Sequence, residues 1–115
     1  MTRLFIRLPE FEKQCKRIGL NEDDVIKIEL TLLGNPTIGD LIKGTGGIRK
    51  VRIPLQNRGK SGGARVIYID FAYYESIYLI TVYEKSTTED LSKAERNELK
   101  ILVQTLEDEL RKRGR

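Results

Sequence analysis

Three closely spaced segments with strand-like composition constrain the fold of this 115-residue chain more than any other feature. Residues 48–53 alternate apolar and polar side chains, and residues 64–74 and 77–83 are dense in β-branched and aromatic side chains. Only a short turn near Glu75-Ser76 separates the last two segments. Because strands this close in sequence pair readily with each other, the pattern predicts an antiparallel meander.

The segment before the meander predicts one more strand and two helices. Residues 2–8 alternate as a half-buried strand does. Pro9 suits a first helical position, and a short helix is predicted over residues 10–18. Asn21 is a good N-cap for a second helix, which reaches Leu33.

The C-terminal part predicts a third helix. Ser92-Lys93-Ala94-Glu95 has the form of a capping box, and an apolar stripe follows it at helical spacing. The stripe consists of Leu99, Leu102, Val103, Leu106 and Leu110. Residues 37–47 are predicted to be a loop that Leu41 and Ile42 anchor to the core. The order strand, helix, helix, three strands, helix predicts a single α+β domain over residues 1–115, with a small, mainly antiparallel sheet.

The absence of histidine and the single cysteine, Cys15, exclude several kinds of site. A zinc site of histidine and cysteine within one chain is unavailable, as is a Ser-His or Cys-His nucleophile. Cys15 is interpreted as a small buried hydrophobe, and neither a metal nor a cofactor is predicted. No apolar run approaches the roughly 18 residues of a spanning helix, so no membrane is expected and the cytoplasm is the predicted location.

Between Asp40 and Asp70 the chain carries seven of its 21 basic residues and none of its 17 acidic residues. The basic residues of this window are Lys43, Arg49, Lys50, Arg52, Arg58, Lys60 and Arg65. Attraction to a phosphodiester backbone depends on how many cations reach it together. This local concentration therefore predicts a polyanion as the partner.

Strand geometry groups some of these cations. If the first strand of the meander forms, Lys50 and Arg52 share one face of the sheet, and Arg65 in the next strand comes near them. Converging cations repel one another, and an anion or solvent relieves that repulsion. Ordinary solvated side chains on an open sheet face would give the same pattern, so both interpretations stay open here. Tyr83 and Lys85 share one side of the last strand and could face the same groove.

The glycine-rich stretches do not match nucleotide-binding loops. Gly59-Lys60-Ser61 resembles the end of the pattern G-x-x-x-x-G-K-[ST], but Pro54 stands where the first glycine is required, and a strand follows instead of a helix. Residues 44–47 lack the third glycine of a dinucleotide fingerprint. Loop flexibility or positive φ angles explain both stretches.

Three stretches in chain order resemble the RelE superfamily of bacterial toxins. They are residues 44–52 (GTGGIRKVR), residues 59–68 (GKSGGARVIY) and the strand 77–83 that runs into Glu84-Lys85. The glycine-rich, basic insertion ahead of the central arginine is most similar to the HigB-like branch. The resemblance rests on the combination and its order, since no single motif is diagnostic.

The resemblance implies a compact α+β fold of order βααβββα and a toxin that enters the ribosomal A site and cuts the messenger RNA there. It also implies a cognate antitoxin, expected to be a helix-turn-helix protein, and no metal. In the family, the 2′-hydroxyl of the RNA attacks the adjacent phosphate. That reaction needs a base, a charge clamp and an acid, none of which must be histidine.

Matching positions carry the family's roles onto four basic residues. Arg65 resembles the phosphate-stabilising arginine and is expected to clamp the scissile phosphate. Lys50 and Arg52 resemble the paired basic residues of the preceding strand, and Lys50 is the expected base. Lys85 resembles the basic residue after the last strand and is expected to stabilise or protonate the leaving group.

The sequence departs from the family pattern at one point. Where well-known members place a catalytic tyrosine, this chain has Leu91, and Tyr83 is the candidate to supply the ring by stacking or proton donation. The remaining cations are expected to hold ribosomal RNA or message backbone. They are Lys43, Arg49, Arg58 and Lys60.

Two other functions stay open. The superfamily also contains toxins of the same fold that inhibit DNA gyrase and have no nuclease activity, although the combined presence of the four basic residues argues against that function. A non-catalytic RNA-binding module would carry the same cations and bind RNA in a salt-dependent way without cutting it.

Overall fold

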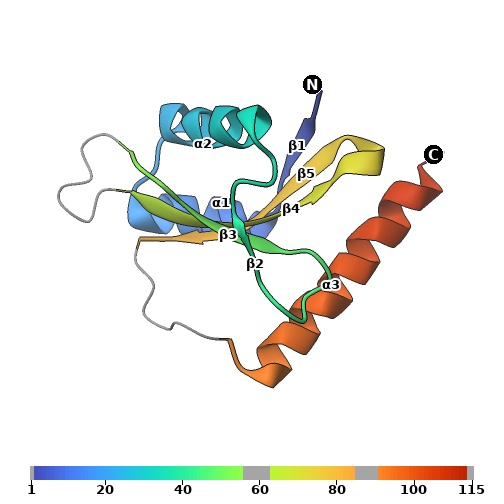
Figure 1. The fold of residues 1–115 in the computed structure, drawn as a ribbon. Helices are drawn as coiled ribbons and strands as arrows, with labels where there is room; N and C mark the ends of the chain where they lie inside the picture. The colour runs from blue at the N-terminus through green and yellow to red at the C-terminus, as the bar shows by residue number, and fades with distance from the viewer. Residues whose placement is uncertain (1, 56–62, 85–90, 114–115) are drawn as a thin grey trace.

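The computed structural model describes residues 2–55, 63–84 and 91–113 of the chain (Figure 1). Its elements are β1 (Leu4–Arg7), α1 (Pro9–Ile18), α2 (Glu22–Gly34), β2 (Asp40–Leu41), β3 (Arg49–Ile53), β4 (Ala64–Phe71), the 3₁₀ turn η1 (Ala72–Tyr74), β5 (Ser76–Tyr83) and α3 (Lys93–Lys112). Within these three ranges, no helix has the length and apolar composition needed to cross a membrane.

The strands form one five-stranded sheet in the order β1-β5-β4-β3-β2. The meander β3-β4-β5 is antiparallel, β2 adds to it in the antiparallel direction, and β1 pairs with β5 in parallel at the opposite edge. The predicted α+β class with a mainly antiparallel sheet is therefore confirmed. The two-residue strand β2 was not predicted, because so short an edge strand has no periodicity to detect.

Helices cover both faces of the sheet (Figure 1). On one face, Phe11 of α1 and Ile28 of α2 join a core that includes Leu79 of β5, and all three side chains are fully buried. On the other face, Val103 and Leu106 of α3 belong to a second core. Because the central strands are buried on both sides, their residues are almost continuously apolar instead of alternating.

The local signals at the helix ends are confirmed. Pro9 is the first residue of α1, and Gly19 ends it in the left-handed conformation with φ 79°. Asn21 forms a capping box at α2, where its side chain accepts from a backbone N–H of the first turn. Ser92 and Glu95 form the same reciprocal arrangement at α3. Each box satisfies backbone donors that the helix itself cannot pair.

Two expectations, one about the loop before β3 and one about the end of β4, need correction. Leu41 was expected to anchor its loop to the core, but its side chain is 61% exposed because β2 is an edge strand. Ile42 does pack against the α3 core, as predicted. The strand predicted over residues 64–74 ends at Phe71, since the chain turns through η1 before β5 begins.

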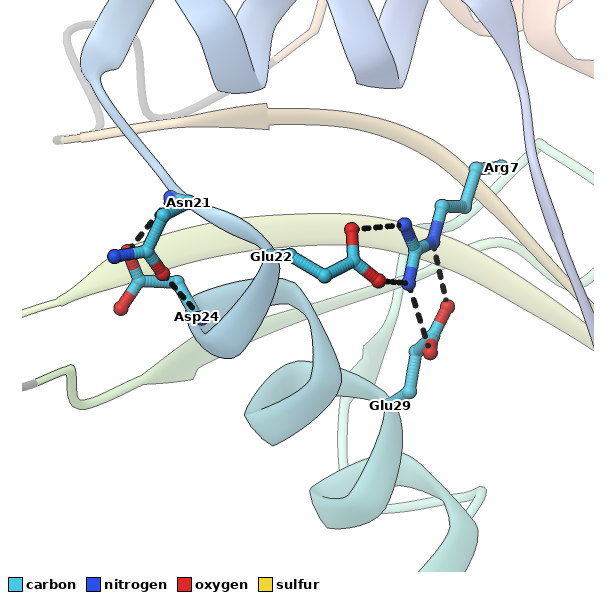
Figure 2. A network of polar contacts seen from close by, with 5 residues as sticks. All are labelled: Arg7, Asn21, Glu22, Asp24 and Glu29. Carbon is cyan, nitrogen blue, oxygen red and sulfur yellow. Dashed lines mark hydrogen bonds and ion pairs between the residues drawn. The ribbon is translucent and has the colours of Figure 1, made fainter.

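An ion-pair network ties β1 to α2 (Figure 2). The Arg7 guanidinium donates to both carboxylate oxygens of Glu22, at 2.9 Å each, and to both of Glu29, at 2.9 and 3.2 Å. These bonds raise the pKa of Arg7 and lower that of Glu22. Figure 2 also shows the adjacent capping box of Asn21 and Asp24. The network fixes the start of α2 against the sheet.

Tyr68 fastens the loop between α2 and β2 to the sheet. Its ring is fully buried, and its hydroxyl donates to the Pro36 carbonyl at 2.8 Å and accepts from the Gly39 N–H at 3.0 Å. Burial raises the pKa of the Tyr68 phenol, so the hydroxyl keeps its proton. The loop held in this way leads directly into β2.

Candidate functional site

Two neighbouring rows of residues cross the sheet on the face that α3 covers. In the first row, Arg65 of β4 lies directly opposite Arg52 of β3 on one side and Tyr83 of β5 on the other. In the second row, Ile67 takes the central place, with Lys50 opposite it on β3. The register thus brings Lys50, Arg52, Arg65 and Tyr83 together on one sheet face. Strand alternation indicated this for the three cations.

A β-bulge decides on which face Tyr83 lies. Ile67 pairs with Thr81, but the next residue of β4 pairs with Leu79, so Ile80 is an extra residue on β5. Before the bulge, Leu79 packs in the α1–α2 core, whereas after it Tyr83 packs at the α3 core. If the same residues alternated regularly after Leu79, with no bulge, Tyr83 would share the face of Leu79 and point away from the cations.

The two arginines of the first row stand close enough to act on one anion. Residues directly opposite on antiparallel strands have Cβ atoms about 4.5–5.5 Å apart, and diagonal neighbours are about 7–8 Å apart. Arg52 and Arg65 are such a direct pair, and Lys50 is diagonal to Arg65. A phosphate between them could accept hydrogen bonds from both guanidinium groups.

A groove of about 800 Å³ adjoins these rows. Lys50, Ile67 and Thr81 lie in its floor, and the N-terminal half of α3 forms one wall. Its lining residues are Asp40, Leu41, Ile42, Lys43, Lys50, Ile67, Thr81, Tyr83, Leu91, Glu95, Arg96, Glu98, Leu99 and Leu102. Arg52 and Arg65 are not lining residues, and Tyr83 belongs to both the groove and the arginine row. The arginine row therefore lies at one end of the groove.

Several groove residues were missed from the sequence. Asp40 lies directly opposite Lys50 in the β2–β3 pair, so a carboxylate stands beside that lysine. It was overlooked because it marks the boundary of the window without acidic residues. Arg96 and Glu98 of α3 also line the groove. The only sequence signal for them was their place between the capping box and the apolar stripe.

The remaining predicted site residues are more dispersed. Lys43 is exposed and lines the groove. Arg49 alternates with Lys50 and so lies on the other face of β3, where its guanidinium donates to the Gly39 carbonyl at 2.7 Å and to the Thr37 carbonyl at 3.3 Å. Those bonds support the loop before β2. Lys85, Arg58 and Lys60 lie outside the described residues.

The glycine stretch 44–47 packs against α3 and supports the groove from below. Gly44, Gly46 and Gly47 all have positive φ, at 82°, 84° and 125°, as the sequence interpretation expected. A Cβ at Gly46 would lie 3.6 Å from the Val103 side chain. The stretch is a tight connection beneath the helix, with no helix N-terminus behind it of the kind that holds a nucleotide.

The described residues give little support for a metal site or for a reactive cysteine. No group of three or more His, Cys, Asp or Glu side chains in residues 2–55, 63–84 and 91–113 is arranged to hold a metal ion. Cys15 lies on the buried face of α1, and burial raises the pKa of its thiol to about 11. This cysteine has the character of an inert core residue.

Fold and site together define a small α+β domain that presents a row of cations at the end of a partly apolar groove. A family model described as the RelE toxin of the RelE/RelB toxin-antitoxin system matches residues 7–113, and the chain belongs to this family. Among solved structures, it resembles a mutant of the E. coli toxin RelE in the free state. That match has a TM-score of 0.54 and 14% sequence identity, covering 88% of this chain and 96% of the other. The similarity confirms the RelE-like fold, and the HigB-like branch stays a prediction.

Proposed function

We propose that this protein is the toxin of a toxin–antitoxin pair and acts as a metal-independent endoribonuclease on messenger RNA in the ribosomal A site. The observation that carries the proposal is the row Arg52–Arg65–Tyr83, with Lys50 diagonal to Arg65 at the end of one groove. Family membership supports the toxin assignment.

The proposed reaction is an internal phosphoryl transfer. The RNA 2′-oxygen forms a bond to the adjacent phosphorus while the bond from phosphorus to the 5′-oxygen breaks, which leaves a cyclic phosphate and a free 5′-hydroxyl. One proton leaves the 2′-hydroxyl and one is delivered to the 5′-oxygen, so no water, metal or cofactor is consumed. Negative charge accumulates on the phosphate oxygens in the transition state, and fixed cations there lower the barrier.

Arg65 occupies the central position for that charge. Its planar fork of donors can hold two phosphate oxygens at once, and Arg52 opposite it adds a second cation. Lys50, one residue pair further along the strands, is proposed as the base that takes the proton of the 2′-hydroxyl. Tyr83 is close enough to Arg65 to stack on a base or donate a proton. Lys85, which follows the last strand, is proposed to assist the leaving group.

The other proposed contacts concern docking and control. Lys43, Arg58 and Lys60 provide charge for ribosomal RNA or message backbone. Arg49 is expected to contribute less to docking, because its guanidinium already bonds to two loop carbonyls on the other face.

We propose that the chain works in the cytoplasm, where translating ribosomes are, and that a cognate antitoxin of the helix-turn-helix class inhibits it.

The test is to map the 5′ ends of a defined message in a purified translation system, with and without ribosomes. We expect cuts only with ribosomes and wild-type protein. Arg65→Ala should lower the single-turnover rate at least about a hundredfold, the scale seen when one charge-stabilising donor is removed. Arg17→Ala is the matched control, since Arg17 is exposed on α1 across the sheet. Cutting by Arg65→Ala at a near wild-type rate would refute the assignment.

The same system separates the two alternatives. A gyrase inhibitor would leave transcripts intact and block DNA supercoiling by purified gyrase. A non-catalytic RNA-binding module would bind RNA with strong salt dependence and give no cut ends even on ribosomes. Either result would exclude the nuclease.

A further inference from the structure

The first turn of α3 brings one more arginine to the groove. Arg96 lines the groove from the helix wall, while Lys50 and Tyr83 line it from the sheet. The Nε atom of Arg96 is buried and has no hydrogen-bond partner in the part of the chain that the structure describes. Buried polar atoms in proteins almost always have a partner, so this donor is a candidate for ligand binding.

Local packing holds the Arg96 side chain in place. The capping box of Ser92 and Glu95 fixes the turn that carries it, and the Arg96 N–H donates to the Ser92 carbonyl at 3.0 Å. A Cβ at Gly44 would lie 3.6 Å from the Arg96 Cδ, so the glycine stretch runs directly along the aliphatic part of the side chain. A side chain held in this way loses little conformational entropy when it binds a ligand.

The charges around Arg96 leave it suited to an outside anion. Three carboxylates also line the groove, those of Asp40, Glu95 and Glu98. Glu95 accepts from the Ser92 N–H at 2.8 Å as part of the capping box. Within residues 2–55, 63–84 and 91–113, none of the ion pairs involves Arg96. Arg96, Lys43 and Lys50 balance these three carboxylates, and the row of Arg52 and Arg65 at the end of the groove adds two further cations.

We propose that Arg96 is a further RNA-binding residue, which donates from Nε and a terminal amino group to a message phosphate next to the scissile one. The inference rests on the proposed function, because it takes the groove as the path of the message. The planar Nε–Nη edge of arginine matches two phosphate oxygens, whereas lysine offers only a point charge. Arg96 thus binds and orients the RNA from the helix wall, opposite the residues that act on the scissile phosphate.

The test uses a short single-stranded RNA that is 2′-O-methylated throughout, so that it cannot be cut. Binding is measured over a range of salt concentrations for wild type, Arg96→Gln and Lys100→Gln. Lys100→Gln is the matched control, because it removes the same charge from an exposed position on the same helix. Lys100 is not a lining residue of the groove. Thermal unfolding of each variant shows whether the fold is retained.

Losing one phosphate contact should reduce the slope of log K against log salt by about 0.7 for single-stranded RNA. We expect that reduction for Arg96→Gln, together with about tenfold weaker binding, and unchanged values for Lys100→Gln. Arg96→Lys keeps the charge and should keep the slope while binding about tenfold more weakly, because the Nε donor is gone. This variant also decides the question if Arg96→Gln unfolds.

Equal slopes for Arg96→Gln and Lys100→Gln would overturn the inference, as would wild-type affinity in Arg96→Lys or salt-independent binding by the wild type. Cleavage on ribosomes without a slope difference would overturn the role of Arg96 alone. A slope difference without any cleavage by the wild type would refute the nuclease and support Arg96 as an RNA-binding residue.

Discussion

Replacing Tyr68 by phenylalanine tests whether one hydroxyl holds the loop between α2 and β2 against the sheet. The substitution keeps the buried ring and removes only the oxygen that bonds to the Pro36 carbonyl and the Gly39 N–H. Both backbone groups belong to buried residues, so each loses its partner without ready access to water. Leaving a buried donor or acceptor unpaired costs about 1–3 kcal/mol. With partial relaxation of the loop, Tyr68→Phe should lower the free energy of unfolding by about 2–4 kcal/mol.

The assay is urea and thermal unfolding followed by circular dichroism. At roughly 4 °C per kcal/mol for a chain of this size, Tm should fall by about 8–16 °C, with the denaturant m-value unchanged. Tyr73→Phe is the matched control, because the Tyr73 side chain is 73% exposed, and it should stay within about 0.5 kcal/mol of wild type. If Tyr68→Phe were as stable as Tyr73→Phe, the hydroxyl would not be holding the loop and the reasoning would be refuted.

Three further predictions concern stability and reactivity. Arg7 lowers the pKa of Glu22, so their pairing stabilises the fold above the ordinary glutamate pKa of 4.5. This stabilisation is lost as the pH falls through the lowered pKa of Glu22. Glu22→Gln should therefore remove that part of the acid dependence when the free energy of unfolding is measured from pH 7 to pH 2. Gly46→Ala should lower the free energy of unfolding by about 1–2 kcal/mol, because Gly46 has a positive φ. Gly34 lies in α2 with open space around it, so Gly34→Ala should raise the free energy of unfolding by up to about 1 kcal/mol. Denaturant titrations measure both changes. With its thiol pKa near 11, Cys15 should resist a thiol-specific reagent at pH 8 until urea unfolds the chain, and rapid modification of the native protein would contradict its burial.

Local signals in the sequence predicted the elements well, because each depends on neighbouring residues alone. Pro9, Asn21 and Ser92 mark helix starts by backbone chemistry that operates within one turn. The apolar stripe of α3 packs into one core, as its spacing predicted. The errors fell where burial depends on distant partners. Leu41 looked like a core residue by type but lies on an edge strand.

The candidate site was predictable to the extent that it follows strand alternation. Lys50 and Arg52 share a face because alternate residues of a strand do, and Arg65 joins them because β4 pairs directly with β3. The sequence could not place Asp40 opposite Lys50, since that depends on a two-residue edge pairing. The place of Arg96 in the groove wall depends in the same way on how α3 packs over the sheet.

The sequence by itself determined the order of elements, the concentration of positive charge and the exclusion of histidine-based sites, because these depend on residue type and local spacing. Tertiary structure decided which charges meet. The clearest case is the bulge at Ile80, which turns Tyr83 to the face of Arg65. A single extra residue reverses the alternation of everything after it, and only the pairing with β4 reveals that it is there.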